Sequence, residues 1–398
     1  MTNLPQGWEV KKLEEIANIK GGKRLPKGEN LLDNNTKFAY IRVADFQDNG
    51  TINLQNIKFI NENTYNVLKN YKIYDDNLYI SIAGTIGKSG IIPKELNGAI
   101  LTENAVKLEY IQNNISNKFM YFFTLSNIFK TQIQTSTKIV AQPKLAITRL
   151  KQIQIPLPPL KEQERIVGIL DESFAKIDES IKILEQDLLN LDELMQSALQ
   201  KAFNPLKDNA KENYKLPQSW EWKSLEEISE NISAGGDKPK NCTESKTAKN
   251  QIPVYANGVN NNGLVGYTDK ATIIKPSLTI SARGTIGFVC IRKEPYFPIV
   301  RLISLIPCEN ILCLHYLYFC LNFFIAKGEG SSIPQLTIPK FKSLQIPLPP
   351  LKEQEQIAEH LDFVFEKAKA LKELYTKELK DYEELKQSLL DKAFKGKL

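Results

Sequence analysis

The stretch of this 398-residue sequence that most resembles a chemical motif is GTIGKS, residues 84–89. Its Gly-Lys-Ser end is typical of a phosphate-binding P-loop. That motif needs a second glycine five residues before Gly87, and the position holds Ile82. A related stretch later in the chain has Phe288 in place of Lys88. The sequence therefore does not predict a nucleotide site.

The same glycines allow two other interpretations. SIAGTIG at 81–87 and SARGTIG at 281–287 could each form a tight turn, in which glycine permits a positive φ. Alternatively, their backbone N–H groups could approach the phosphates of a polyanion, with Lys88 and Arg283 nearby. Both interpretations remain open from the sequence.

No catalytic constellation is found among the ionisable residues. His315 lies in an aromatic helical run and His360 in a long helical segment, and both are interpreted as packing or surface histidines without a catalytic partner. The many carboxylates of the helical segments are expected to form solvated faces. Neither an Asn/Asp-Pro-Pro-aromatic methyltransferase motif nor a glycine-rich cofactor loop is present. The chain is predicted to catalyse no reaction itself and to bind no metal or cofactor.

Composition is that of a globular protein, with 42% hydrophobic and 25% charged residues. No apolar run approaches the roughly 20 residues of a membrane span, and the first residues do not form a signal peptide, so a cytoplasmic protein is expected. The cysteines are odd in number and form no CxxC pair, which favours reduced thiols over a disulfide framework or a zinc site. They are Cys242, Cys290, Cys308, Cys313 and Cys320.

The net charge of +6 is unevenly distributed. Lys and Arg exceed Asp and Glu by 7 in residues 1–155 and by 5 in 205–345, whereas acidic residues exceed basic ones by 5 in 156–204 and by 1 in 346–398. Two basic blocks suggest two polyanion-binding surfaces.

These blocks belong to a tandem duplication. IPLPPLKEQE occupies both 155–164 and 346–355, and the openings NLPQGWEVKKLEEI and KLPQSWEWKSLEEI are also related. Proline ends a strand and can stand in the first turn of a helix, so each IPLPPLKEQE is predicted to lead from a strand into a helix. Short β-rich runs at 38–43, 78–82, 271–274 and 278–280, and helices at 117–131 and 312–326, predict an α/β or α+β fold for each basic block.

Each IPLPPLKEQE is followed by a long helix, predicted at 161–202 and 352–393, with the first ~60 Å long. Apolar residues of the first recur at alternating spacings of three and four, which indicates a helix-pairing seam. In the second, Lys372 and Lys386 replace Ile181 and Met195, so the seam is less regular. The predicted pairing positions are Leu170, Phe174, Ile177, Ile181, Leu184, Leu188, Leu191 and Met195, with Leu361, Phe365, Tyr375, Leu379, Tyr382 and Leu389.

The order of these parts predicts the topology. Globular unit 1–155 and helical spacer 156–204 precede globular unit 205–345, which opens with a linker at 205–215, and helical spacer 346–398 follows. Paired seams then require the second helix to run back toward the first unit, so the helices are antiparallel and Leu398 lies near Trp8. The expected molecule is a pseudo-two-fold dumbbell.

The doubled IPLPPLKEQ, the long helices after it, the GTIG loops and the LP-x-x-W openings resemble the specificity subunit of type I restriction-modification systems over essentially the whole chain. The resemblance implies an α+β fold with two target recognition domains, 1–155 and 205–345, separated by a long antiparallel coiled coil. It implies that each domain reads one half of a bipartite double-stranded DNA site, and that the helices set the gap and dock two methyltransferase subunits. S-adenosylmethionine, ATP and Mg are expected on the methyltransferase and restriction/translocase partners.

DNA contacts are expected from basic and amide residues in predicted loops, because Arg and Gln read base edges and Lys mostly contacts phosphate. Two alternatives stay open: a coiled-coil structural adaptor whose globular domains bind nucleic acid nonspecifically, and the specificity subunit of a fused restriction-methylation enzyme. The candidate contact residues are Lys23, Arg24, Lys27, Arg42, Lys88, Lys138 and Gln142 in the first domain, and Lys238, Lys240, Arg283, Lys327 and Gln335 in the second.

Overall fold

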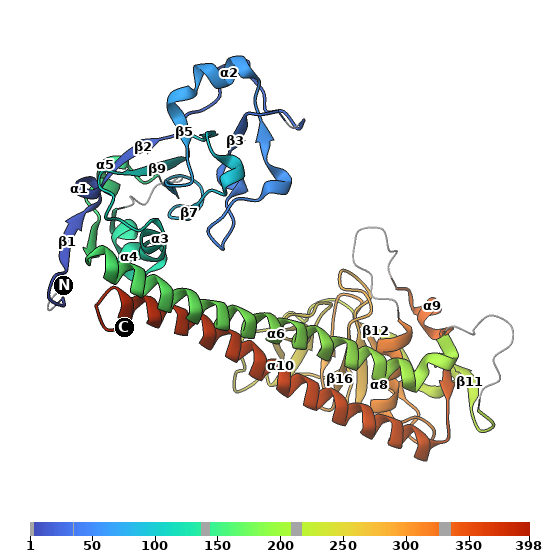
Figure 1. Ribbon diagram of the computed structural model, residues 1–398. Coiled ribbons are helices and arrows are strands. Elements are labelled where there is room, and N and C mark those ends of the chain that lie inside the picture. The colour runs from blue at the N-terminus through green and yellow to red at the C-terminus, as the bar shows by residue number, and fades with distance from the viewer. Residues whose placement is uncertain (1–3, 35, 137–143, 208–216, 326–335) are drawn as a thin grey trace. The chain divides into compact units, whose positions relative to one another are not determined.

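The computed structural model describes residues 4–34, 36–136, 144–207, 217–325 and 336–398 (Figure 1). The chain divides into two compact units, and each contains a globular part and a segment of both long helices. Unit 1 comprises Met1–Leu184 with Lys377–Leu398, and unit 2 comprises Glu185–Thr376.

Unit 1 contains two four-stranded sheets and a two-stranded one. The strand order of the first sheet is β2-β9-β6-β7 and that of the second is β4-β3-β8-β5, while β1 pairs with β10. The strands are β1 (Glu9–Lys12), β2 (Ala17–Gly21), β3 (Ala39–Ile41), β4 (Lys58–Phe59), β5 (Lys72–Ile73), β6 (Leu78–Ser81), β7 (Ser89–Ile91), β8 (Ala99–Leu101), β9 (Ala105–Tyr110) and β10 (Gln154–Leu157). The shorter helices are α1 (Leu13–Ile16), α2 (Glu62–Val67), α3 (Asn117–Leu125), α4 (Asn127–Ser136) and α5 (Ile147–Lys151).

Unit 2 repeats this plan. Its sheets have the orders β12-β18-β15-β16 and β14-β13-β17, and β11 pairs with β19 as β1 pairs with β10. The strands are β11 (Glu221–Ser224), β12 (Ser229–Ala234), β13 (Ile252–Tyr255), β14 (Leu264–Thr268), β15 (Ser277–Ile280), β16 (Val289–Arg292), β17 (Phe297–Pro298), β18 (Ile303–Pro307) and β19 (Gln345–Leu348). The shorter helices are α7 (Leu225–Ile228), α8 (Leu314–Phe324) and α9 (Ile338–Lys342).

Each IPLPPLKEQE leads from a strand into a long helix, as predicted. Pro156 and Pro347 fit in β10 and β19 because these strands belong to two-stranded sheets, in which a proline need not break a second ladder. The helices α6 (Leu160–Lys207, 48 residues) and α10 (Leu351–Ala393, 43 residues) start after the second and third prolines of each motif.

A buried glutamine fixes the start of each long helix. Gln163 is 1% exposed, accepts a hydrogen bond from the Ser116 N–H (2.8 Å) and donates to the carbonyls of Asn114 (3.1 Å) and Pro158 (2.9 Å). Because all three partners are backbone groups, the side chain joins the loop before α3 to the first turn of α6. Gln354 occupies the same place in unit 2.

The two long helices run antiparallel in both units (Figure 1). In unit 1, Leu170 of α6 shares a core with Leu390 of α10, and Lys386 Nζ lies 2.5 Å from Asp178 Oδ1. In unit 2, Lys372 pairs with Asp192. The two seam lysines are thus matched by aspartates on the facing helix, and every predicted pairing position is buried or half-buried.

The segment around Gly396 lies against the N-terminal Trp8 element in unit 1, as the antiparallel topology predicts. A Cβ added to Gly396 would lie 2.3 Å from Pro5 Cγ and 3.6 Å from Trp8 Cζ2. The Arg165 guanidinium also donates to the Leu398 carbonyl (3.0 Å).

Three expected elements differ in the structure. The helix predicted at 117–131 is divided at Ser126, whose backbone is extended and whose hydroxyl accepts from the Phe129 N–H, so it begins a second helix, α4. Residues 271–274 form no strand: Ile273 makes a single bridge to Tyr296, while Ile274 is 71% exposed. Helix α6 continues to Lys207, into the predicted linker. The remainder of that linker, 208–215, lies outside the described residues.

Among the helices that the structure describes, none has the combination of length and hydrophobicity that a membrane-spanning segment needs.

Candidate nucleic-acid interface

In unit 1, the loops that leave four strands meet at one edge of the sheets. Both β2 and β6 run antiparallel to β9 and end opposite its start, where Gly21 pairs with Val106 and Ser81 with Ala105. Strand β3 runs parallel to β8, so its exit lies beside the turn from β8 into β9. We call residues 22–27, 42–45, 82–88 and 102–104 loop edge 1.

Backbone hydrogen bonds hold these loops together. The Lys23 N–H donates to the Leu101 carbonyl (2.9 Å), and the Thr102 N–H donates to the Ile41 carbonyl (3.0 Å). The Ile82 N–H donates to the Asn104 carbonyl (2.8 Å). Loop edge 1 is therefore one connected surface built from segments far apart in the sequence.

Loop edge 1 gathers the five described basic candidates of the first domain: Lys23, Arg24, Lys27, Arg42 and Lys88. Lys23, Arg24 and Lys27 are exposed, and the Arg24 side chain keeps 80% of its accessible surface. An exposed cation on a fixed backbone is suited to contact a phosphate or a base edge. Lys138 and Gln142 lie outside the described residues.

Glu103 on the β8–β9 turn holds the Arg24 guanidinium, with Oε1 2.7 Å from Nε. Partial burial alone would raise the pKa of the Glu103 carboxyl. Hydrogen bonds from Arg24, from its own backbone N–H and from Thr102 outweigh that effect and lower the pKa. Sequence reasoning missed Glu103, although an acidic residue just before a buried strand was the available signal.

Arg42 and Lys88 are engaged in ion pairs within the unit. Arg42 Nη2 lies 2.5 Å from Oδ1 of Asp45, which is 1% exposed, and also donates to the Asn56 carbonyl (2.9 Å). The hydrogen bond to Asp45 raises the pKa of Arg42. Lys88 lies 2.8 Å from Asp48. Releasing Arg42 would leave a buried carboxylate unpaired, so its geometry is that of a structural ion pair.

The GTIG loops form the tight turns that the first interpretation requires. Gly84 and Gly87 have φ of 75° and 88°, and Gly284 and Gly287 have 68° and 83°. In both loops the last glycine N–H donates back to the first serine carbonyl, at 2.9 Å and 3.0 Å. The turns place Lys88 in loop edge 1 and Arg283 in the equivalent loop of unit 2.

Unit 2 builds the same edge from equivalent strands. Strands β12 and β15 end opposite the start of β18, where Ala234 and Ile280 both pair with Ile303, and β13 runs parallel to β17. We call residues 235–240, 256–259, 281–288 and 299–302 loop edge 2. It carries the exposed candidates Lys238, Lys240 and Arg283. Lys327 and Gln335 lie outside the described residues.

One glycine directly after β2 and another directly after β12 allow the loops of each edge to pack closely against one another. A Cβ on Gly22 would lie 2.1 Å from the Thr102 carbonyl oxygen, and a Cβ on Gly235 would lie 2.6 Å from the Ile299 nitrogen. No side chain can occupy such positions without moving the backbone. Both contacts are to the same turn, which leads into β9 or β18.

His315 does have a carboxylate partner, contrary to the sequence interpretation. Its Nδ1 lies 2.6 Å from Asp362 Oδ2, so the pair joins α8 to α10. No sequence pattern could indicate this pair, because the two residues lie on different helices. Within the described residues, no three His, Cys, Asp or Glu side chains are grouped to hold a metal ion.

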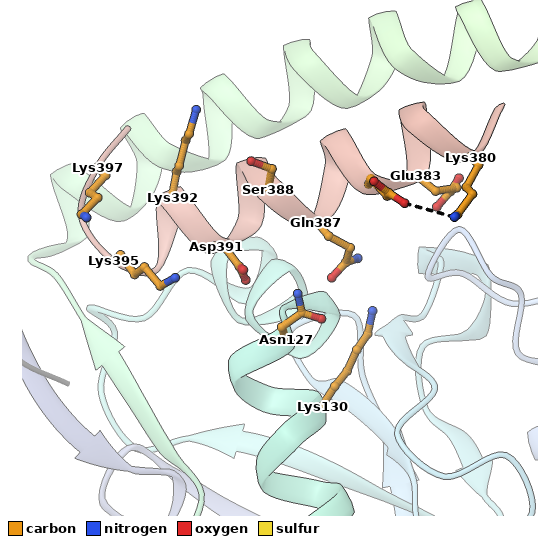
Figure 2. A pocket seen from close by; sticks show the side chains of 11 residues that line it. Asn127, Lys130, Lys380, Glu383, Gln387, Ser388, Asp391, Lys392, Lys395 and Lys397 are labelled. Carbon is orange, nitrogen blue, oxygen red and sulfur yellow. Dashed lines mark ion pairs between the residues drawn. The ribbon is translucent and has the colours of Figure 1, made fainter. Parts of the chain in front are cut away.

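Unit 1 also has a charged groove of about 890 Å³ between the start of α4 and the last turns of α10 (Figure 2). Gln387 Oε1 and Asp391 Oδ1 are buried without a hydrogen-bond partner in the described structure. The groove is lined by five lysines and three carboxylates, so its surface carries charges of both signs. They are Lys130, Lys380, Lys392, Lys395 and Lys397, with Glu383, Glu384 and Asp391.

Comparison with known proteins identifies the family. The family described as "Type I restriction modification DNA specificity domain" matches residues 5–188 and 217–380, most of the chain in two copies. The chain belongs to this family. A putative type I specificity subunit from Mycoplasma pneumoniae is 29% identical over 88% of this chain and 87% of its own length. The putative type I restriction enzyme MjaX specificity subunit from Methanocaldococcus jannaschii is 24% identical over 99% of this chain and 94% of its own.

Solved structures share the fold of this family member. A chain from a structural study of complex assembly and conformational transition in a type I R-M system has a TM-score of 0.81 at 20% identity, with 100% of both chains covered. The HsdS subunit from Thermoanaerobacter tengcongensis has a TM-score of 0.61 at 20% identity, over 100% of this chain and 98% of that one. The predicted α+β fold, with its tandem repeat and long paired helices, is confirmed.

Proposed function

We propose that this chain is the DNA-specifying subunit of a type I restriction-modification complex, in which each loop edge contacts one half of a bipartite double-stranded site. The observation that carries the proposal is the duplication of one loop edge with different side chains. On the β8–β9 turn, loop edge 1 has Glu103, which pairs with Arg24 of the loop after β2, whereas the equivalent turn of loop edge 2 has Val300 and Arg301. Because the two loop edges share a backbone arrangement but carry different side chains, they would read two different half-sites, and the target would be a split, non-palindromic sequence.

The exposed apolar residues of the long helices support docking of two equal partners. Unit 1 exposes Ile183 (56%) on α6 and Leu385 (45%) on α10. Unit 2 exposes Leu194 (52%) on α6 and Leu374 (55%) on α10. Leu374 is the repeat equivalent of Ile183 and Leu385 that of Leu194, so each unit has the same apolar pair. Such pairs suit one methyltransferase subunit each.

Catalysis and its cofactors are assigned to the partners. The methyltransferase subunits would bind S-adenosylmethionine, and a restriction/translocase subunit would use ATP and Mg. This chain would contribute sequence recognition, and α6 and α10 would set the number of base pairs between the half-sites.

The direct test is methylation mapping of DNA exposed to the chain together with its methyltransferase subunit. A motif of two unlike half-sites with a fixed gap is expected. Inserting the same whole number of helical turns into α6 and α10 should change the gap and leave both half-sites unaltered. One continuous motif that is unaffected by the insertion would refute the assignment.

Competition binding separates this function from the structural-adaptor alternative. With the methyltransferase subunit present, a specific site should compete far better than random DNA. Equal competition by random DNA would favour an adaptor with nonspecific nucleic-acid-binding domains.

A further inference from the structure

A strained turn lies in loop edge 2. Val300 and Arg301 have φ of +53° and +59°, in the left-handed region that residues with a Cβ seldom adopt. For a β-branched valine this conformation is a clear outlier. Strain of this kind persists only where the surrounding structure fixes it, and it is concentrated at functional sites.

Neighbouring loops hold the turn in place. The Val300 N–H donates to the Gly236 carbonyl and the Arg301 N–H to the Gly235 carbonyl, both at 2.8 Å. The Asn257 side-chain amide donates to the Val300 carbonyl (2.6 Å), and its oxygen accepts from the Ala282 N–H (2.8 Å). Asn257 therefore joins the strained turn to the loop that carries Arg283.

Core packing does not account for the strain. Val300 is 49% exposed and Arg301 is exposed, so neither side chain fills the interior. Among the described residues, no hydrogen bond or ion pair of the Arg301 guanidinium is found. The turn fixes the backbone of an arginine and leaves its side chain directed to solvent.

Loop edge 1 lacks this arrangement in its described residues. Its equivalent turn, 102–104, has no positive φ, and its Glu103 pairs with Arg24. The strained arginine turn is therefore specific to unit 2, as expected of a residue that distinguishes one half-site from the other.

We propose that Arg301 is a specificity-determining residue that reads a guanine in the half-site bound by unit 2, with Asn257 as its positioning residue. This inference rests on the proposed DNA-specifying function. Arginine donates two parallel hydrogen bonds to guanine O6 and N7 in the major groove, a contact that lysine cannot reproduce with the same geometry. A pre-fixed backbone lowers the ordering cost of that contact.

The test compares Arg301→Lys and Arg301→Ala with the wild-type chain, each assembled with the methyltransferase subunit. Discrimination for guanine at one position of one half-site should fall about 5- to 150-fold in both variants, the range expected for a bidentate arginine contact. Arg301→Lys should retain most of the total DNA affinity, because the positive charge remains. Asn257→Ala should relax the same position.

Lys293→Ala is the matched control. Lys293 is exposed and follows β16, whose end pairs with the start of β15 at the opposite side of the sheet from loop edge 2. This variant should leave the motif unchanged. Thermal unfolding of all variants checks that the fold is retained.

The outcomes separate this inference from the proposed function. A wild-type complex without any sequence-specific motif would refute the function itself. A wild-type bipartite motif that Arg301→Lys leaves intact at every position would refute guanine reading alone. If Arg301→Ala also weakens binding equally at all sequences, Arg301 contacts phosphate instead.

Discussion

Replacing Gln354 by leucine tests whether buried hydrogen bonds fix the start of α10. Gln354 is 0% exposed and accepts from the Cys313 N–H (2.9 Å). It donates to the carbonyls of Ile311 (2.9 Å) and Pro349 (2.8 Å). Leucine has a similar volume but cannot pair with any of these three backbone groups.

The expected cost follows from the surroundings of each group. A buried polar group without a partner costs about 1–3 kcal/mol. The Pro349 carbonyl belongs to a buried residue, whereas Ile311 is 42% exposed and its carbonyl can bond to water. We count the buried Pro349 carbonyl over this full range, set the N–H of the half-buried Cys313 at about 1 kcal/mol and discount Ile311, so Gln354→Leu should lower the free energy of unfolding by about 2–4 kcal/mol. The midpoint of thermal unfolding should fall by roughly 5–15 °C.

The assay is hydrogen exchange read by mass spectrometry, with thermal unfolding measured in parallel. Peptides covering the start of α8 should lose protection in Gln354→Leu, because the Cys313 N–H loses its acceptor. The control is Gln356→Leu, the same chemical change at an exposed position of α10, which should alter stability by less than about 0.5 kcal/mol. Equal stability and exchange in the two variants would refute the reasoning.

Three further predictions concern packing, pairing and reactivity. Gly22→Ala should destabilise unit 1 by about 1–3 kcal/mol, because the added Cβ would meet the Thr102 carbonyl oxygen. The control Gly168→Ala in α6, where nothing lies within 4 Å of the added Cβ, should stabilise the helix by about 0.5–1 kcal/mol. Denaturant unfolding measures both variants, and equal effects would contradict the close-approach argument. Asp178→Ala should cost about 0.5–1 kcal/mol, because it removes the nearer carboxylate of the half-buried Lys386 and leaves only Glu383 of the same helix, 3.5 Å away. Adding Lys386→Met, the residue of the other repeat, should restore stability, and a double variant no more stable than the single would contradict the pairing. Burial raises the pKa of the Cys320 thiol well above its usual value, so Cys320 should resist alkylation in the native protein at pH 8, while the half-buried Cys308 and Cys313 react first. Peptide mapping after alkylation tests this, and labelling of Cys320 as fast as Cys308 and Cys313 would contradict the prediction.

Much of the fold could be predicted because its signals are local or repeated. The proline-to-helix transition depends on backbone restrictions within ten residues, and the paired helices depend on a period visible along each segment. Ser126 shows where such reasoning fails: its apolar flanks continue a helical pattern, but its hydroxyl caps a new helix. Short strands such as β4 and β17 have no periodic signal and form only where a partner strand is present.

The candidate site was predictable only in part. Lys23, Arg24 and Lys27 lie close together in the sequence, and their basic character near glycines was visible. Whether a basic side chain is exposed or paired depends on residues brought in by the fold, as with Lys88 and Asp48. The strained conformation at Arg301 has no sequence signal at all, since valine and arginine are ordinary residues for a strand end.

The sequence by itself determined the tandem duplication, the α+β class, the two long helices and their antiparallel order, because repetition and periodicity are properties of the chain alone. Tertiary structure decided which strand exits form loop edges 1 and 2, since strand pairing is nonlocal. It also decided that Gln163 and Gln354 are buried anchors, although they belong to the conspicuous repeated motif. The physical reason is that burial and hydrogen-bond partners arise from segments distant in sequence, which no local pattern encodes.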